Sequence, residues 1–168
     1  MKTIFLICLL TISKIATSAD VSQSPRAQWL KAHNDARAKK GVRALRWDNL
    51  VAKSARVWAR HLAKSCRMMH EKNSGYGENL WAQSGYGGNV RPIESTVNSW
   101  LREEKFYDPK NPKWCTGGEC RHYTQVMWSG STALGCATIS CGGQGNDKKY
   151  IRVCRYDPQG NFVGKLPY

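Results

Sequence analysis

Acidic residues are few in this sequence. Against 26 lysines and arginines there are only 12 aspartates and glutamates in 168 residues, which gives a net charge of +14 at pH 7. Such an excess predicts attraction to anionic surfaces such as acidic polysaccharide or phospholipid. The sequence also lacks an internal repeat and a low-complexity linker, so its length indicates one domain.

Several motifs of zinc sites and modified proteins are missing as well. There is no His-Glu-x-x-His segment, no Cys-x-x-Cys pair and no Asn-x-Ser/Thr acceptor. These absences argue against a zinc-protease helix, a cysteine zinc site and N-glycosylation. No stretch after residue 19 is apolar enough to cross a bilayer.

The first 19 residues have the layout of a secretory signal peptide. Lys2 precedes an apolar run over residues 4–12, and small residues at 17–19 precede the expected cleavage site. A buried N-terminal helix is the alternative. The predicted organisation is therefore a signal peptide at 1–19 and a mature domain at 20–168. Loss of Lys2 and Lys14 lowers the net charge to +12, and export disfavours nucleic acid as a partner.

Cysteine usage fits an exported chain. Of seven cysteines, Cys8 leaves with the signal peptide. An even number remains, which predicts three disulfides in an oxidising compartment. The six are Cys66, Cys115, Cys120, Cys136, Cys141 and Cys154.

A hairpin suggests how these cysteines pair. Strands are expected over 134–141 and 150–156, around a glycine-rich turn centred near Gly145. That turn sets Cys136 opposite Cys154. Cys141 then needs a distant partner, and Cys66 at the end of the second helix is a suitable one. The resulting scheme pairs Cys66 with Cys141, Cys115 with Cys120, and Cys136 with Cys154.

Helix signals precede the hairpin. Ser24 before Pro25 predicts a helix that ends at Gly41, and Asp48 caps a second one with apolar residues three and four apart. A third helix is expected from Pro92 and a short one over 122–127, with a strand at 79–82. A basic stripe on the second helix is the densest candidate for an anion-facing surface: Lys53, Arg56, Arg60 and Lys64.

Two histidines and two glutamates are the candidate chemical residues, namely His70, Glu78, Glu103 and His122. Two imidazoles and two carboxylates are suitable parts for a divalent cation site or for acid/base chemistry. Spacing alone does not show that they meet.

Four segments resemble the motifs of the CAP superfamily, in order and at fitting intervals. They are residues 32–37 (Ala-His-Asn-Asp-Ala-Arg), 76–81 (Tyr-Gly-Glu-Asn-Leu-Trp), 122–128 (His-Tyr-Thr-Gln-Val-Met-Trp) and 154–162 (Cys-Arg-Tyr-Asp-Pro-Gln-Gly-Asn-Phe). The ending at 163–168 resembles the plant branch, pathogenesis-related protein 1. The likeness covers about 25–168.

The resemblance implies an α/β fold, a single-domain α-β-α sandwich with three disulfides in the scheme given above. It also implies that His70, Glu78, Glu103 and His122 share a central cleft, where His70 and His122 would be the ligands of a zinc ion, although no cofactor is required. Glu103 is preferred to Glu104 because it lies three residues after Trp100. The chain departs from the family pattern at Arg121, usually glycine, and this long cation would narrow the cleft or disfavour a metal.

The function implied by the resemblance is that of a basic plant defence protein, secreted to the apoplast or held in the vacuole. Antimicrobial action would come from binding a sterol or other membrane lipid of a pathogen, through a loop that contains Phe106, Tyr107 and Trp114. Anionic cell-wall polysaccharide is a further expected partner, and the chain is expected to be a monomer without enzymatic activity. The alternatives are a metal-dependent hydrolase and a precursor of a C-terminal signalling peptide, residues 158–168.

Overall fold

The computed structural model describes residues 24–111 and 115–168. The predicted signal peptide and Trp114 of the predicted sterol loop lie outside these residues. Within them, no helix combines the length and the apolar character needed to cross a membrane.

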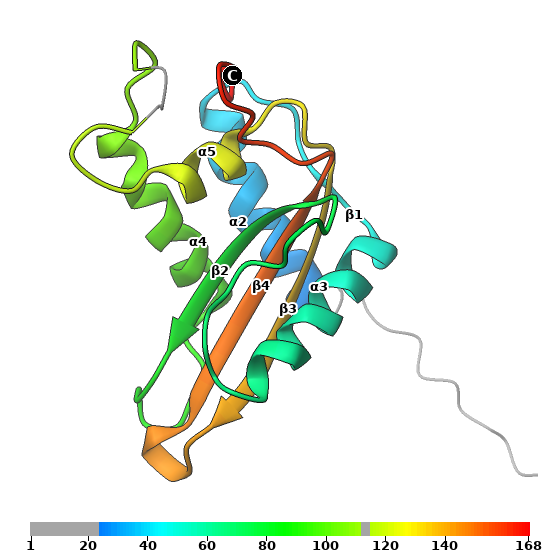
Figure 1. Cartoon of the computed structure of the whole chain (residues 1–168), viewed down its shortest axis with the longest axis vertical. Helices are drawn as coiled ribbons and strands as arrows, with labels where there is room; N and C mark the ends of the chain where they lie inside the picture. The colour runs from blue at the N-terminus through cyan, green and yellow to red at the C-terminus, as the bar shows by residue number, and fades with distance from the viewer. Residues whose placement is uncertain (1–23, 112–114) are drawn as a thin grey trace, which may run out of the picture.

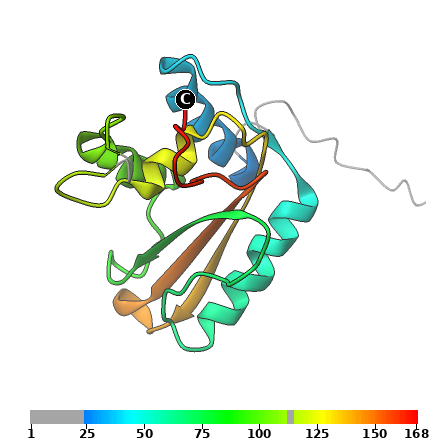
Figure 2. The ribbon, with the colours of Figure 1, turned by 45° about the horizontal axis from the view of Figure 1, so that its top comes forward.

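A four-stranded sheet forms the middle layer, with strand order β1-β3-β4-β2. The strands are β1 (Arg46–Trp47), β2 (Gly77–Gln83), β3 (Ala133–Gly142) and β4 (Lys149–Asp157). Helix α3 (Asn49–Ala63) covers one face (Figures 1 and 2). The other face packs against α2 (Pro25–Lys39), α4 (Ile93–Leu101) and α5 (Arg121–Met127). The predicted α-β-α sandwich is confirmed.

Helix α2 begins as predicted, because the Ser24 hydroxyl accepts a hydrogen bond from the Ala27 N–H at 3.2 Å. Three polar residues of its motif are structural. His33 and Arg37 are fully buried, and the Asn34 amide bonds both backbone groups of Leu45. The Arg37 guanidinium donates to the carbonyl oxygens of four residues: Arg43, Val126, Trp128 and Ser131. One side chain thus ties α2 to the end of α5.

Helix α3 packs its apolar side on the sheet and leaves the predicted basic stripe exposed. Its N-cap is Asp48, whose carboxylate accepts from the N–H groups of Leu50 and Val51 at 2.7 and 3.0 Å. Gly135 of β3 permits a close approach, since a Cβ there would lie 2.1 Å from the Ala52 nitrogen. The helix therefore lies almost directly on the strand backbone.

The hairpin and all three disulfides form as predicted. Cys136 lies directly opposite Cys154 in the β3–β4 register, and a short 3₁₀ turn, η2 (Gly145–Asp147), closes the loop. The bonded pairs are Cys66–Cys141, Cys115–Cys120 and Cys136–Cys154. The first of these bridges joins the end of α3 to the end of β3.

Two elements were not expected from the sequence. Strand β1 has only two residues and runs parallel to β3, so it carries no alternating pattern of its own. A 3₁₀ segment, η1 (Arg102–Phe106), follows α4 directly. Glu103 therefore lies on this tighter turn, just beyond the helix that was expected from Pro92.

Candidate functional site

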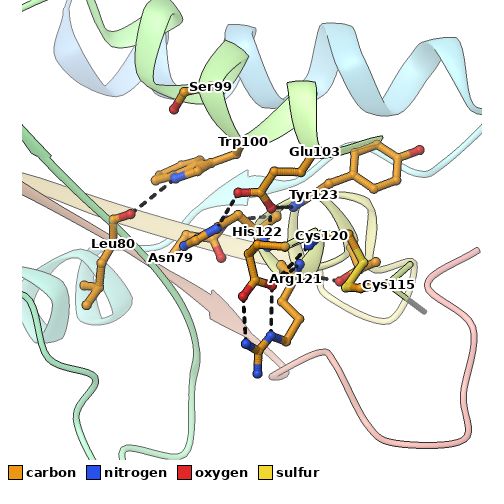
Figure 3. Close-up of polar contacts among 12 residues, drawn as sticks. Asn79, Leu80, Ser99, Trp100, Glu103, Cys115, Cys120, Arg121, His122 and Tyr123 are labelled. Carbon is orange, nitrogen blue, oxygen red and sulfur yellow. Dashed lines mark hydrogen bonds and ion pairs between the residues drawn. A yellow bond between two sulfur atoms is a disulfide. The ribbon is translucent and has the colours of Figure 1, made fainter. Parts of the chain in front are cut away.

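The first histidine–glutamate pair lies where η1 meets the start of α5. The Nδ1 atom of His122 is 2.7 Å from Oε1 of Glu103, and the other carboxylate oxygen accepts from the His122 backbone N–H at 3.0 Å (Figure 3). The imidazole also stacks near-parallel on Trp100, with ring centroids 6.2 Å apart. Glu104 instead forms an ion pair with Lys40. The choice of Glu103 thus agrees with the geometry.

The second pair joins His70, in the loop before β2, to Glu78 on β2. The Nδ1 atom of His70 is 2.8 Å from Oε1 of Glu78, and the Glu78 side chain is only 6% exposed against 64% for His70. Buried Arg155 donates to the other oxygen of Glu78 at 3.3 Å and also to Glu71. Arg155 faces Glu78 directly in the β2–β4 register. The pairing of opposite charges across the two strands was therefore the signal that could have identified Arg155 as a site residue.

Two consecutive residues of β2, Glu78 and Asn79, contact the two pairs, and their side chains point to opposite faces of the sheet. Glu78 points to the α3 side, where Arg155 also bonds Ser54 of α3. Asn79 points to the other side, because side chains alternate along a strand, and its amide donates to the His122 carbonyl oxygen at 3.0 Å. The four predicted residues thus form two histidine–glutamate pairs that neighbouring residues of one edge strand contact, and their convergence in one cleft stays a prediction.

The two imidazoles match one feature of zinc ligands. A histidine that binds zinc usually donates its other ring N–H to a carboxylate, and both Nδ1 atoms do so here, which leaves each Nε2 for a metal. Among the described residues, however, no group of three or more histidine, cysteine or acidic side chains gathers to hold a metal ion. A zinc ion here would rely on His70 and His122 together with water.

Arg121 is held by an acidic neighbour. Its guanidinium donates to both carboxylate oxygens of Glu119, at 2.9 and 2.7 Å. The hydrogen bond from Arg121 lowers the pKa of Glu119 to about 2. Figure 3 shows the Arg121 side chain pointing away from the Glu103–His122 pair. The effect of this cation on the cleft beside His122 stays a prediction.

The described aromatics of the predicted sterol loop pack against their own protein. The Phe106 ring covers Gly118, where a Cβ would lie 2.8 Å from ring atoms. The Tyr107 ring lies 5.7 Å from the Tyr123 ring and 6.0 Å from the Tyr168 ring. Burial, followed by the nearby Tyr168 and Asp108, raises the pKa of the Tyr107 phenol. These two aromatics are thus partly used in packing.

A cavity of about 550 Å³ lies between α2 and α4. Its wall includes small and apolar side chains, namely Ala32, Ala36, Ile93, Leu101 and Met127. Charged residues at the wall are partly paired, as in the Lys31–Asp35 and Lys40–Glu104 ion pairs. The sequence signal for this cavity was the pair Ala32 and Ala36, which lie four residues apart on one face of α2, because small side chains leave space where two helices meet.

The C-terminal segment runs beside α5 and is bonded to it. The Gly160 N–H donates to the Gln125 side chain at 3.0 Å, and the Asn161 amide donates to the Arg121 carbonyl oxygen at 2.9 Å. Farther along, the Tyr168 hydroxyl lies 2.7 Å from that of Tyr123. Phe162, in the same segment, is 42% exposed.

Comparison with known proteins assigns the family. Residues 30–156 match the family model described as "CAP: Cysteine-rich secretory protein family", and the chain therefore belongs to this family. Within it, the chain falls in the plant pathogenesis-related protein 1 group. It is 37% identical to pathogenesis-related protein 1B of Nicotiana tabacum over 168 residues, which covers 100% of this chain and 95% of that protein. The basic form of pathogenesis-related protein 1 of the same plant is also 37% identical, over 99% of this chain and 88% of that protein.

Solved structures show the same fold. NaASP2, crystallised with Zn²⁺, superposes with a TM-score of 0.68 at 26% identity, over 85% of this chain and 84% of that one. BmVAL-1 also gives a TM-score of 0.68, at 22% identity, over 86% of this chain and 82% of that one. At 22% identity, the likeness to BmVAL-1 shows the fold alone.

Proposed function

We propose that this chain is a secreted plant defence protein that acts by binding a membrane lipid of a pathogen, such as a sterol. The names of its relatives support the defence role, since the most similar proteins are called pathogenesis-related. Three disulfides support an oxidising, extracellular or vacuolar compartment. The proposal treats the chain as a monomeric binding protein without a required cofactor.

The cavity between α2 and α4 is the observation that carries the lipid proposal. Its volume of about 550 Å³ falls in the range of small-ligand sites, roughly 300–1,000 Å³. An apolar wall from Ala32, Ile93 and Met127 suits the hydrocarbon part of a lipid, while lysines at the same wall suit a polar end. The cavity is therefore a second candidate location for lipid binding, in addition to the loop of Phe106, Tyr107 and Trp114.

Ergosterol binding to the disulfide-bonded mature protein tests the proposal and separates the two locations. The variant Ala32→Phe fills the cavity, and Ala38→Phe on the exposed side of α2 is its matched control. We expect saturable binding that Ala32→Phe weakens at least tenfold and that Ala38→Phe leaves unchanged. A triple alanine variant of Phe106, Tyr107 and Trp114 that abolishes binding instead would place the sterol at the loop. Absence of saturable binding in the unmodified protein would refute the proposal.

A broad hydrolase screen belongs beside the binding assay. All six mature cysteines are bonded in disulfides, so no cysteine nucleophile remains in the mature chain. Zinc binding through His70 and His122 is a separate proposal, supported by the carboxylate partner of each imidazole and by the relative crystallised with Zn²⁺. Metal-dependent turnover in the screen would contradict the description of the chain as a binding protein only.

A further inference from the structure

A second hollow lies beside β3, beyond the two residues that pair with β1, and its charge is of one sign. This groove has a volume of about 680 Å³. Its lining includes four arginines: Arg26, Arg56, Arg91 and Arg152. Among the described residues, no acidic side chain lines the groove and none forms an ion pair with these arginines. The lysines of the cavity between α2 and α4, by contrast, include two paired with carboxylates.

Arg152 is the innermost of the four arginines and is only 2% exposed. Its guanidinium donates to two backbone carbonyl oxygens and to the Thr96 hydroxyl, and it lies 5.5 and 5.0 Å from the ring centroids of Trp29 and Trp81. Its Nε atom is buried and has no hydrogen-bond partner. Burial alone lowers the pKa of this side chain to about 10. A buried cation without a counter-charge costs free energy, which an anion in the groove would reduce.

The outer part of the groove offers cations next to apolar surface. Arg26 and Arg56 are exposed and approach it from α2 and α3. The half-buried Trp47 and the apolar side chains of Val90 and Ile139 also line the groove. The first turn of α2, which also borders the groove, contains no acidic residue, so its N-terminal dipole adds to the positive potential.

We propose that this groove binds an acidic polysaccharide through the carboxylates of its uronate sugars. Guanidinium groups match carboxylates in a planar, two-bond geometry that ammonium groups do not offer. Sugar rings present flat C–H faces, which pack well against an aromatic ring such as Trp47. A hollow of this size accepts a short stretch of a flexible sugar chain, whereas a flat bilayer surface cannot enter it. The site is separate from the cavity proposed for lipid.

Calorimetric titration with tetragalacturonate tests the proposal on the disulfide-bonded mature protein. The groove variant is Arg26→Gln with Arg56→Gln, and the control variant is Arg43→Gln with Arg60→Gln. All four arginines are exposed, so both variants should fold, and both lose the same net charge. We expect the groove variant to bind roughly tenfold more weakly, the control to change less than about threefold, and wild-type affinity to fall with added salt.

Three results would overturn the proposal. An equal loss in both variants would show diffuse attraction by net charge rather than a site. Equal binding of the fully methyl-esterified tetramer would rule out carboxylate recognition. No binding of tetragalacturonate, combined with binding to phosphatidylglycerol vesicles that depends on Arg26 and Arg56, would assign the groove to anionic lipid instead.

Discussion

We expect the buried histidine of α2, His33, to make the folded protein less stable in acid. His33 is fully buried, and its Nδ1 lies 2.8 Å from the Trp29 carbonyl oxygen while its Nε2 lies 3.0 Å from the Tyr156 hydroxyl. A carbonyl oxygen can only accept, so Nδ1 carries the proton and Nε2 accepts from the hydroxyl. That hydroxyl in turn accepts from the Asn79 amide at 3.2 Å. Protonation of Nε2 would break this chain inside the core.

The magnitude follows from the pKa of the imidazole. Burial lowers the pKa of His33 from 6.5 to about 4, and the nearby charge of Arg37 acts in the same direction. Between pH 6.5 and pH 4, His33 of the unfolded chain therefore binds a proton that His33 of the folded chain does not bind. The free energy of unfolding thus falls as the pH falls through this window. Each pKa unit is worth about 1.4 kcal/mol, which gives a loss of roughly 3 kcal/mol by pH 4.

Thermal unfolding of the mature protein between pH 7 and pH 4, with its disulfides intact, measures this loss. For a chain of this size, 3 kcal/mol corresponds to a drop of roughly 6–12 °C in Tm. The variant His33→Gln should be less stable at pH 7 but lose less on acidification, whereas His61→Gln, which removes an exposed imidazole from α3, should behave like the wild type. If wild type and His33→Gln lost equal stability over this window, the reasoning would be wrong. An NMR titration midpoint of His33 near 6.5 would refute it independently.

Three further predictions concern the cleft, the long bridge and the contact between α3 and β3. Calorimetry should detect weak zinc binding that a His70→Ala, His122→Ala double variant abolishes, and undiminished binding would place the metal elsewhere. Replacing Cys66 by Ala opens a bridge that spans 75 residues, and denaturant unfolding should show a loss of about 4 kcal/mol; a loss below about 1 kcal/mol would contradict the loop-entropy argument. Gly135→Ala should lower the unfolding free energy by about 3 kcal/mol, because its Cβ would overlap the α3 backbone, and an unchanged Tm would disprove that close approach.

The sequence was informative wherever local chemistry decides the structure. The side chains of Ser24 and Asp48 cap helices that begin at the next residue, and the glycine-rich turn set the register that joins Cys136 to Cys154. These features depend on neighbours a few residues away along the chain. The resemblance added the expectation that the two histidines and two glutamates meet, but which glutamate pairs with which histidine came from the structure.

The remaining features depend on tertiary contacts that no local pattern reports. Strand β1 exists because β3 offers it a partner, and Arg155 reaches Glu78 only once β2 and β4 are paired. The groove of arginines likewise draws residues from α2, α3 and β4. The basic stripe on α3 was visible in the sequence, but only Arg56 of that stripe lines the groove.

Strand β2 has a consequence for how this protein can vary. Glu78 and Asn79 are neighbours in the chain, yet they serve opposite faces of the sheet. Inserting or deleting one residue in β2 before Glu78 would turn both side chains to the other face. The contact of Glu78 with His70 and the contact of Asn79 with the His122 carbonyl oxygen would then be broken at once. These two contacts are therefore expected to be kept or lost together in descendants of this gene, whereas the pairing of His122 with Glu103 involves no residue of β2.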